Sequence, residues 1–487
     1  MYTFLIAVVV LVAGYFLYGM LMEKIFGVDP SRITPANRLA DGVDYVPMPW
    51  YKIYLIQFLN IAGLGPIFGA IAGAMWGPSA FLWIVFGSIF GGAMHDFLSG
   101  MMSVRLDGLS LPEIIGRYLG KPVMQFMRGF TVILMVLVGA VFIMGPAGIL
   151  ANLTADSFSI GSLTFKLDLT FWAVVVFIYY FLATMLPIDK LIGRVYPVFG
   201  FALLFMAVAI IGSILFGNYH IPELIGNLRN EHIKGDAMPI FPMMFISIAC
   251  GAISGFHATQ SPLMARCMKN EKYGRRIFYG AMITEGIIAL IWAAAAMAFF
   301  GGVDQLNETM VAHKSDAAWV VNTISNSMLG RFGAVLALLG VVAAPITSGD
   351  TAFRSARLIV SDFMHFSQKK IIHRLTIAAP LFLFGFILTQ VNFGIIWRYF
   401  AWSNQTLATV TLWTITVFLV LEKKIWIVSA LPAVFMTMVV TTYIFFAPEG
   451  LNIDYNTSVI VGACITTVIT GLFLVWLTRT RNRLPSE

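Results

Sequence analysis

Thirteen stretches of this chain are apolar over nearly the length that a helix needs to cross a membrane. About 20 helical residues cross the roughly 30 Å hydrocarbon core of a bilayer. Only 11% of the 487 residues are charged, less than half of the roughly 25% typical of soluble domains. The sequence therefore predicts an all-α polytopic membrane protein with about 13 transmembrane helices. The expected spans cover residues 3–22, 53–76, 80–104, 124–150, 169–187, 191–216, 240–264, 277–300, 332–350, 371–390, 393–420, 425–446 and 458–478.

The distribution of Lys and Arg tests this map of spans. When the N-terminus is placed outside, 25 of the 31 Lys and Arg residues fall in inside segments and 5 in outside segments, and Arg398 lies within a span. Loops on the cytoplasmic side carry such an excess of basic residues. The split predicts an outside N-terminus and a cytoplasmic C-terminus. Because the charges form no basic face, the net charge of +7 does not indicate nucleic-acid binding.

Two of the expected spans are interrupted near their middle. Gly63, Gly65 and Pro66 interrupt the second span, and Gly255 and His257 interrupt the seventh. Broken helices in corresponding positions of two repeats mark the binding site of many transporters. Because the seventh span comes five spans after the second, an odd number, the second copy must run through the membrane in the opposite direction. The pattern predicts a 5+5 inverted repeat with one extra N-terminal helix and two extra C-terminal helices. The expected divisions are 1–52 (first helix and cytoplasmic loop), 53–216 and 240–420 (the repeats), and 425–487 (two helices and a cytoplasmic tail).

A break in a membrane helix frees backbone groups that lipid cannot satisfy, so these groups must line a cavity or contact protein. The starts of half-helices favour anions and freed carbonyl groups favour cations. We therefore expect substrate at Gly63, Gly65, Pro66, Gly255 and His257. The alternative is that the glycines only allow helices to pack closely.

Ionisable residues within spans are costly and mark functional sites. Asp96 and Glu285 are the expected proton carriers, with His95 beside them, because burial favours the neutral form of a carboxyl group. The alternative is a structural network with Arg or His. His95 and Asp96 are adjacent, so their side chains should point about 100° apart on a helix and form no dyad. This argues against a membrane enzyme.

Two further sets of polar residues lie in or near later spans. Arg398 is a candidate to hold a substrate carboxylate through two hydrogen bonds, although it could instead pair with a carboxylate of the chain or reach the membrane interface. The ninth span is expected to end in APITSGDT, where Thr347, Ser348 and Asp350 offer oxygen atoms for Na⁺. The alternative for these three is a polar helix terminus beside the cytoplasmic loop.

Six blocks of the sequence together resemble one family. They are TPANRLADGVDYVPM (34–48), AGLGPIFG (62–69), GAMHDF (92–97), SIACGAISGFHA (247–258), GAMITE (280–285) and SNQTLA (403–408). In this order they resemble the carbon starvation protein CstA family, and the chain looks like a short-form member. The resemblance implies a LeuT-like fold of the amino acid–polyamine–organocation superfamily, located in the inner membrane of a bacterium or archaeon. It also places family motifs on Asn37, Asp41, Asp44, Asp96 and His257.

The resemblance narrows the expected function to import of a small carbon source. It implies peptide uptake during carbon starvation or, as in some members, proton-coupled pyruvate uptake. Asn404, within SNQTLA, joins the expected substrate-binding residues, whereas the stretch around Arg398 departs from longer members. We expect alternating access driven by H⁺, or by Na⁺, with no cofactor. A channel or a sensor is the alternative of another class, and no filter motif or signalling domain favours either.

Overall fold

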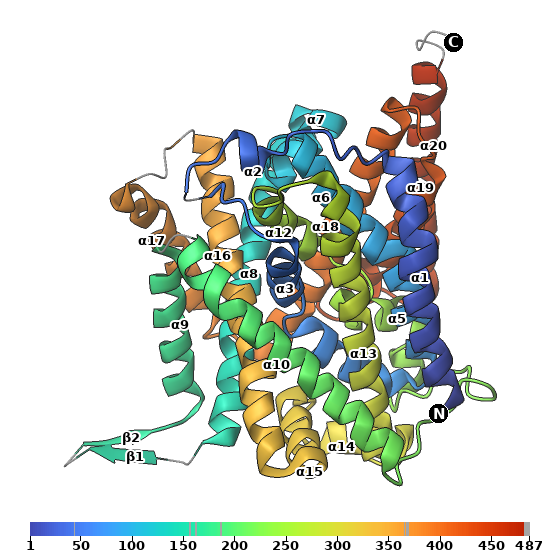
Figure 1. The fold of residues 1–487 in the computed structure, drawn as a ribbon. Helices are drawn as coiled ribbons and strands as arrows, with labels where there is room; N and C mark the ends of the chain where they lie inside the picture. The colour runs from blue at the N-terminus through green and yellow to red at the C-terminus, as the bar shows by residue number, and fades with distance from the viewer. Residues whose placement is uncertain are drawn as a thin grey trace.

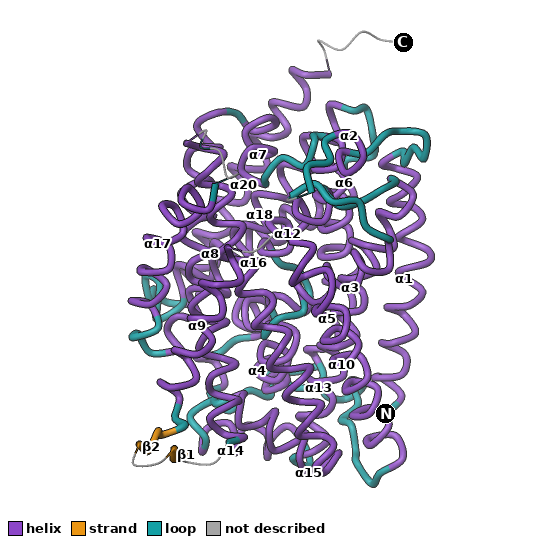
Figure 2. The backbone as a smooth tube through the Cα atoms, turned by 60° about the vertical axis from the view of Figure 1, so that its left-hand side comes forward, coloured by secondary structure: helices purple, strands orange, loops and turns teal. Residues whose placement is uncertain are grey.

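Long helices that run roughly side by side form nearly the whole molecule in the computed structural model (Figures 1 and 2). The structure describes residues 1–481 except 43, 155–156, 161–162, 186–187, 365 and 367–369. The predicted cytoplasmic tail beyond residue 481 lies outside the described residues. The first half contains α1 (Tyr2–Phe26), α2 (Pro35–Arg38), α3 (Trp50–Ile61), α4 (Ala70–Gly73), α5 (Ser79–Phe86), α6 (Met94–Arg105), α7 (Leu111–Leu119), α8 (Lys121–Leu153), β1 (Ser157–Ile160), β2 (Leu163–Lys166), α9 (Leu169–Met185) and α10 (Ile188–Phe216). The second half contains α11 (Phe245–Ser247), α12 (Gly255–Ala265), α13 (Gly280–Phe299), α14 (Val303–Ala312), α15 (Ala317–Ala337), α16 (Ala343–Met364), α17 (Ile371–Leu388), α18 (Phe393–Leu421), α19 (Ile427–Phe446) and α20 (Tyr455–Arg481).

Each expected span coincides with a helix or a broken helix. Within the described part of the chain, nine helices are long and apolar enough to cross a membrane, and a shorter apolar helix covers Leu169–Ala183. The second span is a pair of helices, Trp50–Ile61 and Gly65–Trp76, bent by 55°. The seventh span comprises α11 and α12, and the ninth comprises the end of α15 together with α16. The prediction of an all-α multi-pass protein is confirmed, with one addition, the antiparallel hairpin of β1 and β2.

The two broken spans pack against each other at their breaks. A Cβ atom added at Gly65 would lie 2.2 Å from Cβ of Cys250, and one added at Gly73 would lie 2.2 Å from Cγ1 of Ile248. Close approach of this kind needs glycine, since any side chain would overlap the facing helix. The glycines therefore serve close packing as well as interruption of the helices.

The ninth span ends later than the sequence indicates. Helix α16 runs to Met364, so Thr347, Ser348 and Asp350 lie in its first half and not at its terminus. The expected boundary was wrong because Arg354 and Arg357 read as loop residues, whereas both are buried, each only 2% exposed. Arg354 donates a hydrogen bond to the carbonyl oxygen of Ala183 in α9 at 3.0 Å. A contact inside the protein thus allows the helix to continue through two basic residues.

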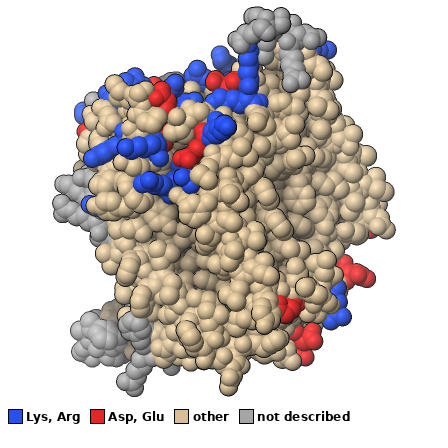
Figure 3. Space-filling view, turned by 45° about the vertical axis from the view of Figure 1, so that its right-hand side comes forward, with Lys and Arg blue, Asp and Glu red and all other residues tan. Residues whose placement is uncertain are grey.

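The two ends of the chain lie at opposite ends of the molecule (Figure 1). On the face seen in Figure 3, Lys and Arg gather at the end that carries the C-terminus, and the broad middle carries few charges. An uncharged middle between polar ends is the surface that a bilayer requires. Helices α1 and α20 are peripheral, because only 28% and 22% of their most apolar windows are buried.

Candidate functional site

The break in the seventh span leaves backbone groups that three side chains satisfy. Ser254 is extended, with φ −150° and ψ 126°, and α12 begins directly after it. Gln405 of α18 donates to the carbonyl oxygen of Ile253 at 2.9 Å, and Ser88 donates to that of Gly251 at 3.0 Å. The break is therefore an ordered feature of the protein interior, as irregular backbone at membrane depth must be.

Asn404 of α18 caps the start of α12. Its Oδ1 accepts hydrogen bonds from the backbone N–H of Phe256 at 2.7 Å and from the hydroxyl of Ser254 at 3.1 Å. Its Nδ2 approaches Sγ of Cys250 at 3.3 Å. An amide oxygen that satisfies a free N–H at a helix start stabilises that start. The structure thus brings Asn404 to the break, where its contacts are with the chain itself.

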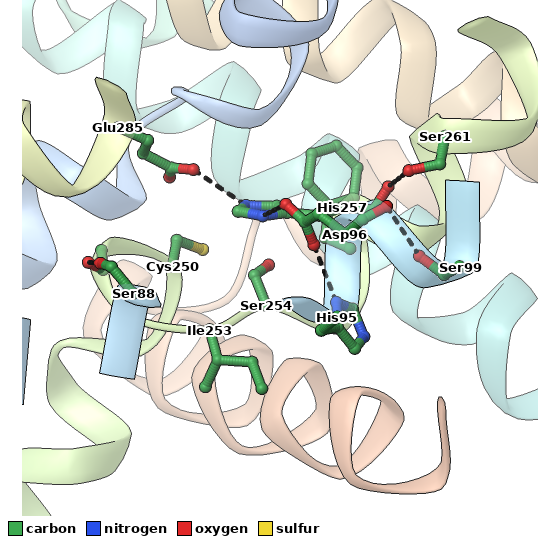
Figure 4. Close-up of polar contacts among 12 residues, drawn as sticks. Ser88, His95, Asp96, Ser99, Cys250, Ile253, Ser254, His257, Ser261 and Glu285 are labelled. Carbon is green, nitrogen blue, oxygen red and sulfur yellow. Dashed lines mark hydrogen bonds and ion pairs between the residues drawn. The ribbon is translucent and has the colours of Figure 1, made fainter. Parts of the chain in front are cut away.

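Four ionisable side chains form a continuous line beside this break (Figure 4). Nδ1 of His95 lies 2.8 Å from Oδ1 of Asp96, and Nδ1 of His257 lies 2.9 Å from Oδ2 of the same carboxylate. Nε2 of His257 lies 3.4 Å from Oε2 of Glu285. All four residues are 0% exposed. Helices α6, α12 and α13 therefore bring together the three expected proton-coupling residues and His257.

The expectation that His95 and Asp96 form no pair was wrong. The helical angle of 100° separates their Cα–Cβ directions, but the imidazole ring is long enough to turn back toward the neighbouring carboxylate. The two oxygens of Asp96 then serve two different histidines. Asp96 thus contacts His95 of its own helix, α6, and also His257 of α12.

Sequence reasoning missed two residues at the break of the second span. Gln57 and Asn60 are 0% exposed, and within the described part of the chain neither side-chain N nor O atom of either residue has a hydrogen-bond partner. An unsatisfied buried polar group costs about 1–3 kcal/mol, so such groups call for an explanation. Their spacing of three places them on one face of α3. Polar side chains within a span that leads into a Gly–Pro break were the available signal.

Glu285 is a further buried residue whose polar side-chain atoms lack hydrogen bonds in the described part of the chain. Both of its carboxyl oxygens lack a hydrogen-bond partner among the described residues, although Oε2 lies 3.4 Å from Nε2 of His257. The hydroxyl groups of Tyr54 in α3 and Thr284 in α13 lie 2.7 Å apart. This contact joins the helix of Gln57 and Asn60 to the helix of Glu285.

The residues expected to bind Na⁺ divide into two groups. Ser348 donates to the carbonyl oxygen of Leu59 at 3.2 Å, at the break of the second span, and Thr347 donates to that of Ala344 at 2.6 Å. Asp350 instead accepts a hydrogen bond from the hydroxyl of Tyr196 in α10 at 2.8 Å. Hydroxyl and carbonyl oxygens suit a hard cation. Thr347 and Ser348 place such oxygens beside the break, whereas the bond from Tyr196 to Asp350 joins α16 to α10.

Gly63 lies at the same junction of α3 and α16. A Cβ atom there would be 2.8 Å from the ring of Phe142 and 3.1 Å from Oγ of Ser348. Pro66 is fully enclosed in the π-helical turn Gly65–Gly69. Gly255 packs against α18, since its Cβ would lie 2.5 Å from the backbone N of Ala408. Gly63 and Gly255 therefore allow neighbouring helices to approach each break closely.

The structure does not bring Arg398 to the line of ionisable residues. It lies near the start of α18, its side chain is 48% exposed, and it forms an ion pair with Glu449 at 3.3 Å. The placement in a substrate cavity is therefore corrected to a surface ion pair near the start of that span. A long basic side chain near a helix end readily reaches the membrane interface.

The motif at residues 34–48 ties two segments together at the end of the molecule that carries the C-terminus. Asn37 donates to the carbonyl oxygen of Lys269, which follows α12, at 2.9 Å. The hydroxyl of Tyr45 donates to the carbonyl oxygen of Asp107, which follows α6, at 2.9 Å. The guanidinium of Arg266 lies 5.3 Å from the Tyr45 ring. The motif therefore links the ends of the two helices that carry Asp96 and His257.

Comparison with known proteins gives the relationships of the chain. The family model for carbon starvation protein CstA matches residues 1–163 and 147–331. An uncharacterized membrane protein of Haemophilus influenzae is 44% identical over an alignment of 349 residues that covers 63% of this chain and 94% of that protein. The peptide transporter CstA of Bacillus subtilis is 26% identical and covers 83% of this chain and 82% of its own length. The pyruvate/proton symporter BtsT of Escherichia coli is 27% identical and covers 60% and 48%.

Two solved structures share the fold. A manganese transporter of Eremococcus coleocola, in complex with an aromatic bis-isothiourea substituted compound, is 14% identical with a TM-score of 0.53, covering 91% of this chain and 99% of that chain. MhsT in complex with L-phenylalanine is 14% identical with a TM-score of 0.55, covering 80% and 98%. At this identity the likeness concerns the fold alone, and it confirms the predicted polytopic, LeuT-like transporter fold.

Proposed function

Because this chain belongs to the carbon starvation protein CstA family, we propose that it imports a small carbon source, principally peptides, by proton-coupled symport. It is a multi-pass membrane protein and a transporter of this family. The proposal rests chiefly on the buried line of His95, Asp96, His257 and Glu285. Ionisable groups buried at membrane depth are costly, pair with one another, and commonly mark proton relays or substrate pathways.

The line offers a route for one proton. A proton on Glu285 neutralises a carboxyl group whose oxygens otherwise lack hydrogen bonds. Transfer to Nε2 of His257 gives an imidazolium between two carboxylates, one of them Asp96 at 2.9 Å. Each transfer changes the charge beside the break in the seventh span, so protonation alters the polar contacts that hold the break. That change is the proposed coupling between the proton and the opening of the site.

The proposed substrate position lies between the two breaks. The start of α12 favours the carboxylate that peptides and pyruvate share. The unpartnered side chains of Gln57 and Asn60 offer donors and acceptors for a peptide bond. The carboxyl oxygens of Glu285, which lack hydrogen-bond partners among the described residues, offer a partner for a peptide ammonium group, which pyruvate lacks. This last feature favours peptides, and the greater coverage of the chain by the relative named as a peptide transporter supports the same choice.

Pyruvate with a proton remains the second candidate substrate, since the relative named for that transport is as similar in identity. Na⁺ is the second candidate coupling ion. Thr347 and Ser348 at the break of the second span are its proposed ligands, together with the backbone oxygens of Leu59 and Ala344. Asp350 has no part in this proposal.

We propose alternating access in which two groups of spans, each drawn from both repeats (53–216 and 240–420), move relative to each other. The second, third, seventh and eighth spans would rock against the fourth, fifth, ninth and tenth, with the extra helices at the periphery. The end that carries the C-terminus and gathers Lys and Arg (Figure 3) would face the cytoplasm.

Uptake into proteoliposomes tests the proposal. Purified protein is reconstituted, a pH or Na⁺ gradient is imposed, and accumulation of labelled pyruvate is compared with that of dipeptides and tripeptides. We expect accumulation of a peptide under an inward proton gradient and its loss in Glu285→Gln. If no gradient drives accumulation of any of these solutes, symport is wrong and a channel or a sensor becomes the better reading.

A further inference from the structure

An apolar groove of about 530 Å³ lies between α7, α8, α18 and α20, away from the proposed transport site. The residues that define it include Tyr118, Leu119, Trp413, Val417, Phe473 and Trp476. Its volume is within the roughly 300–1,000 Å³ of sites that hold small molecules. It borders α20, whose most apolar window is only 22% buried. The groove therefore lies at the periphery, where the surface faces lipid.

One end of the groove reaches the polar end of the molecule. The rings of Tyr118, at the end of α7, and Phe418, near the end of α18, are 5.6 Å apart. The rings of Phe473 and Trp476 in α20 are 5.9 Å apart. Tyr and Trp collect at the boundary between headgroups and hydrocarbon. The groove thus runs from this boundary toward the middle of the spans.

Two basic residues stand at this end. Arg117 directly precedes Tyr118, and Lys121 lies between the groove residues Leu119 and Val123. Both are exposed, and within the described part of the chain neither forms an ion pair. Glu422 is the acidic residue whose charge acts on Tyr118. The two positive charges of Arg117 and Lys121 therefore exceed the negative charge of Glu422 at this end of the groove. An apolar groove with a cationic end matches a lipid that has apolar chains and a negative headgroup.

We propose that this groove binds an anionic phospholipid, with an acyl chain in the groove and the headgroup at Arg117 and Lys121. A second copy of the chain fits less well, because an apolar protein surface would leave the two cations without a counter-charge. Each basic residue near an anionic lipid surface contributes about fivefold in affinity. Removal of both therefore predicts about a 25-fold weaker preference for anionic lipid, and added salt should weaken the preference in the wild type.

Native mass spectrometry of the full chain tests this binding without any transport assay. The protein is delipidated and titrated with phosphatidylglycerol or with phosphatidylcholine of the same acyl chains. Arg117→Gln/Lys121→Gln removes the cationic end, and Val417→Trp fills the groove. Lys269→Gln is the matched control, because Lys269 is an exposed basic residue outside the groove. Size-exclusion chromatography and thermal unfolding establish that each variant is folded.

We expect the wild type and Lys269→Gln to retain phosphatidylglycerol in preference to phosphatidylcholine. The double variant should lose the preference, and Val417→Trp should retain less of both lipids. Equal retention of the two lipids by the wild type would overturn the proposal, as would a preference that survives in the double variant. If the wild type is dimeric and Val417→Trp makes it monomeric, the groove is an interface between copies and the lipid proposal is wrong.

Discussion

Asp96→Asn tests whether the buried line of ionisable residues carries a proton. Each oxygen of Asp96 accepts a hydrogen bond from a different histidine, at 2.8 and 2.9 Å. Asparagine keeps one acceptor and turns a donor toward the other ring. One imidazole must then change tautomer or lose its bond, which costs about 1–3 kcal/mol. We expect the variant to fold with lowered stability and to lack the charge that a proton relay needs.

A pH gradient of two units supplies about 2.7 kcal/mol per proton, which corresponds to about 100-fold accumulation of a neutral solute carried with one proton. We expect the wild type to approach this ratio in proteoliposomes and Asp96→Asn to reach a ratio of about 1. Exchange of labelled for unlabelled solute, which needs no net proton movement, should persist in the variant. It separates a loss of coupling from a loss of binding.

Ser99→Ala is the matched control. Ser99 lies on the same helix, is 3% exposed, and donates to the backbone oxygen of Asp96 at 3.3 Å without touching its carboxylate (Figure 4). It should accumulate solute like the wild type. If Asp96→Asn does so as well, the carboxylate carries no coupling role and the line of four residues is a structural network.

Three further perturbations test the packing at Gly65, the cap of α12 and the loop that follows α10. Gly65→Val should prevent folding, since even a Cβ would lie 2.2 Å from Cys250, whereas Gly129→Val meets open space and should give monodisperse protein in size-exclusion chromatography. Asn404→Ala should lower stability by about 1–2 kcal/mol through loss of a helix cap, measured by thermal unfolding. Burial lowers the pKa of His232 from 6.5 to about 4. The folded loop therefore disfavours the charged ring and should lose stability as pH falls from 6.5 toward 4. Hydrogen-exchange protection factors in residues 229–238, which correct for the slower intrinsic exchange at low pH, should decrease over this range in the wild type and not in His232→Gln.

The order of spans could be predicted from sequence because hydropathy and loop charge report directly on the bilayer. The break in the seventh span could be predicted because its glycines occupy the position in the second repeat that corresponds to the Gly–Pro break in the first. The end of the ninth span could not, because Arg354 is satisfied by a carbonyl group of another helix. A hydropathy scale scores every arginine as a loop residue, because it does not register a hydrogen-bond partner inside the protein.

The candidate site was predictable in its ionisable members and not in its neutral ones. Asp96 and Glu285 stand out because a charge within a span has a large cost. Gln57 and Asn60 carry no charge. They become candidate site residues only because their buried side chains lack hydrogen-bond partners among the described residues. Arg398 shows the converse error. It was a candidate to hold a substrate carboxylate, with a carboxylate of the chain or the interface as the alternative, and its position near the start of α18 allows it to reach Glu449.

The two candidate coupling sites differ in the helices that they join. His95, Asp96, His257 and Glu285 all belong to the spans proposed to move as one group, so a proton there acts through the break of the seventh span. The bond from Ser348 to the backbone of Leu59 crosses between the two proposed groups, so a cation bound there would tie them together directly. Ser348→Ala should therefore change any dependence of uptake on Na⁺ and leave the proton-driven ratio intact, whereas Asp96→Asn should do the opposite. If both variants abolish proton-driven accumulation and spare exchange, the two sites act as one coupled unit and the separation of roles is wrong.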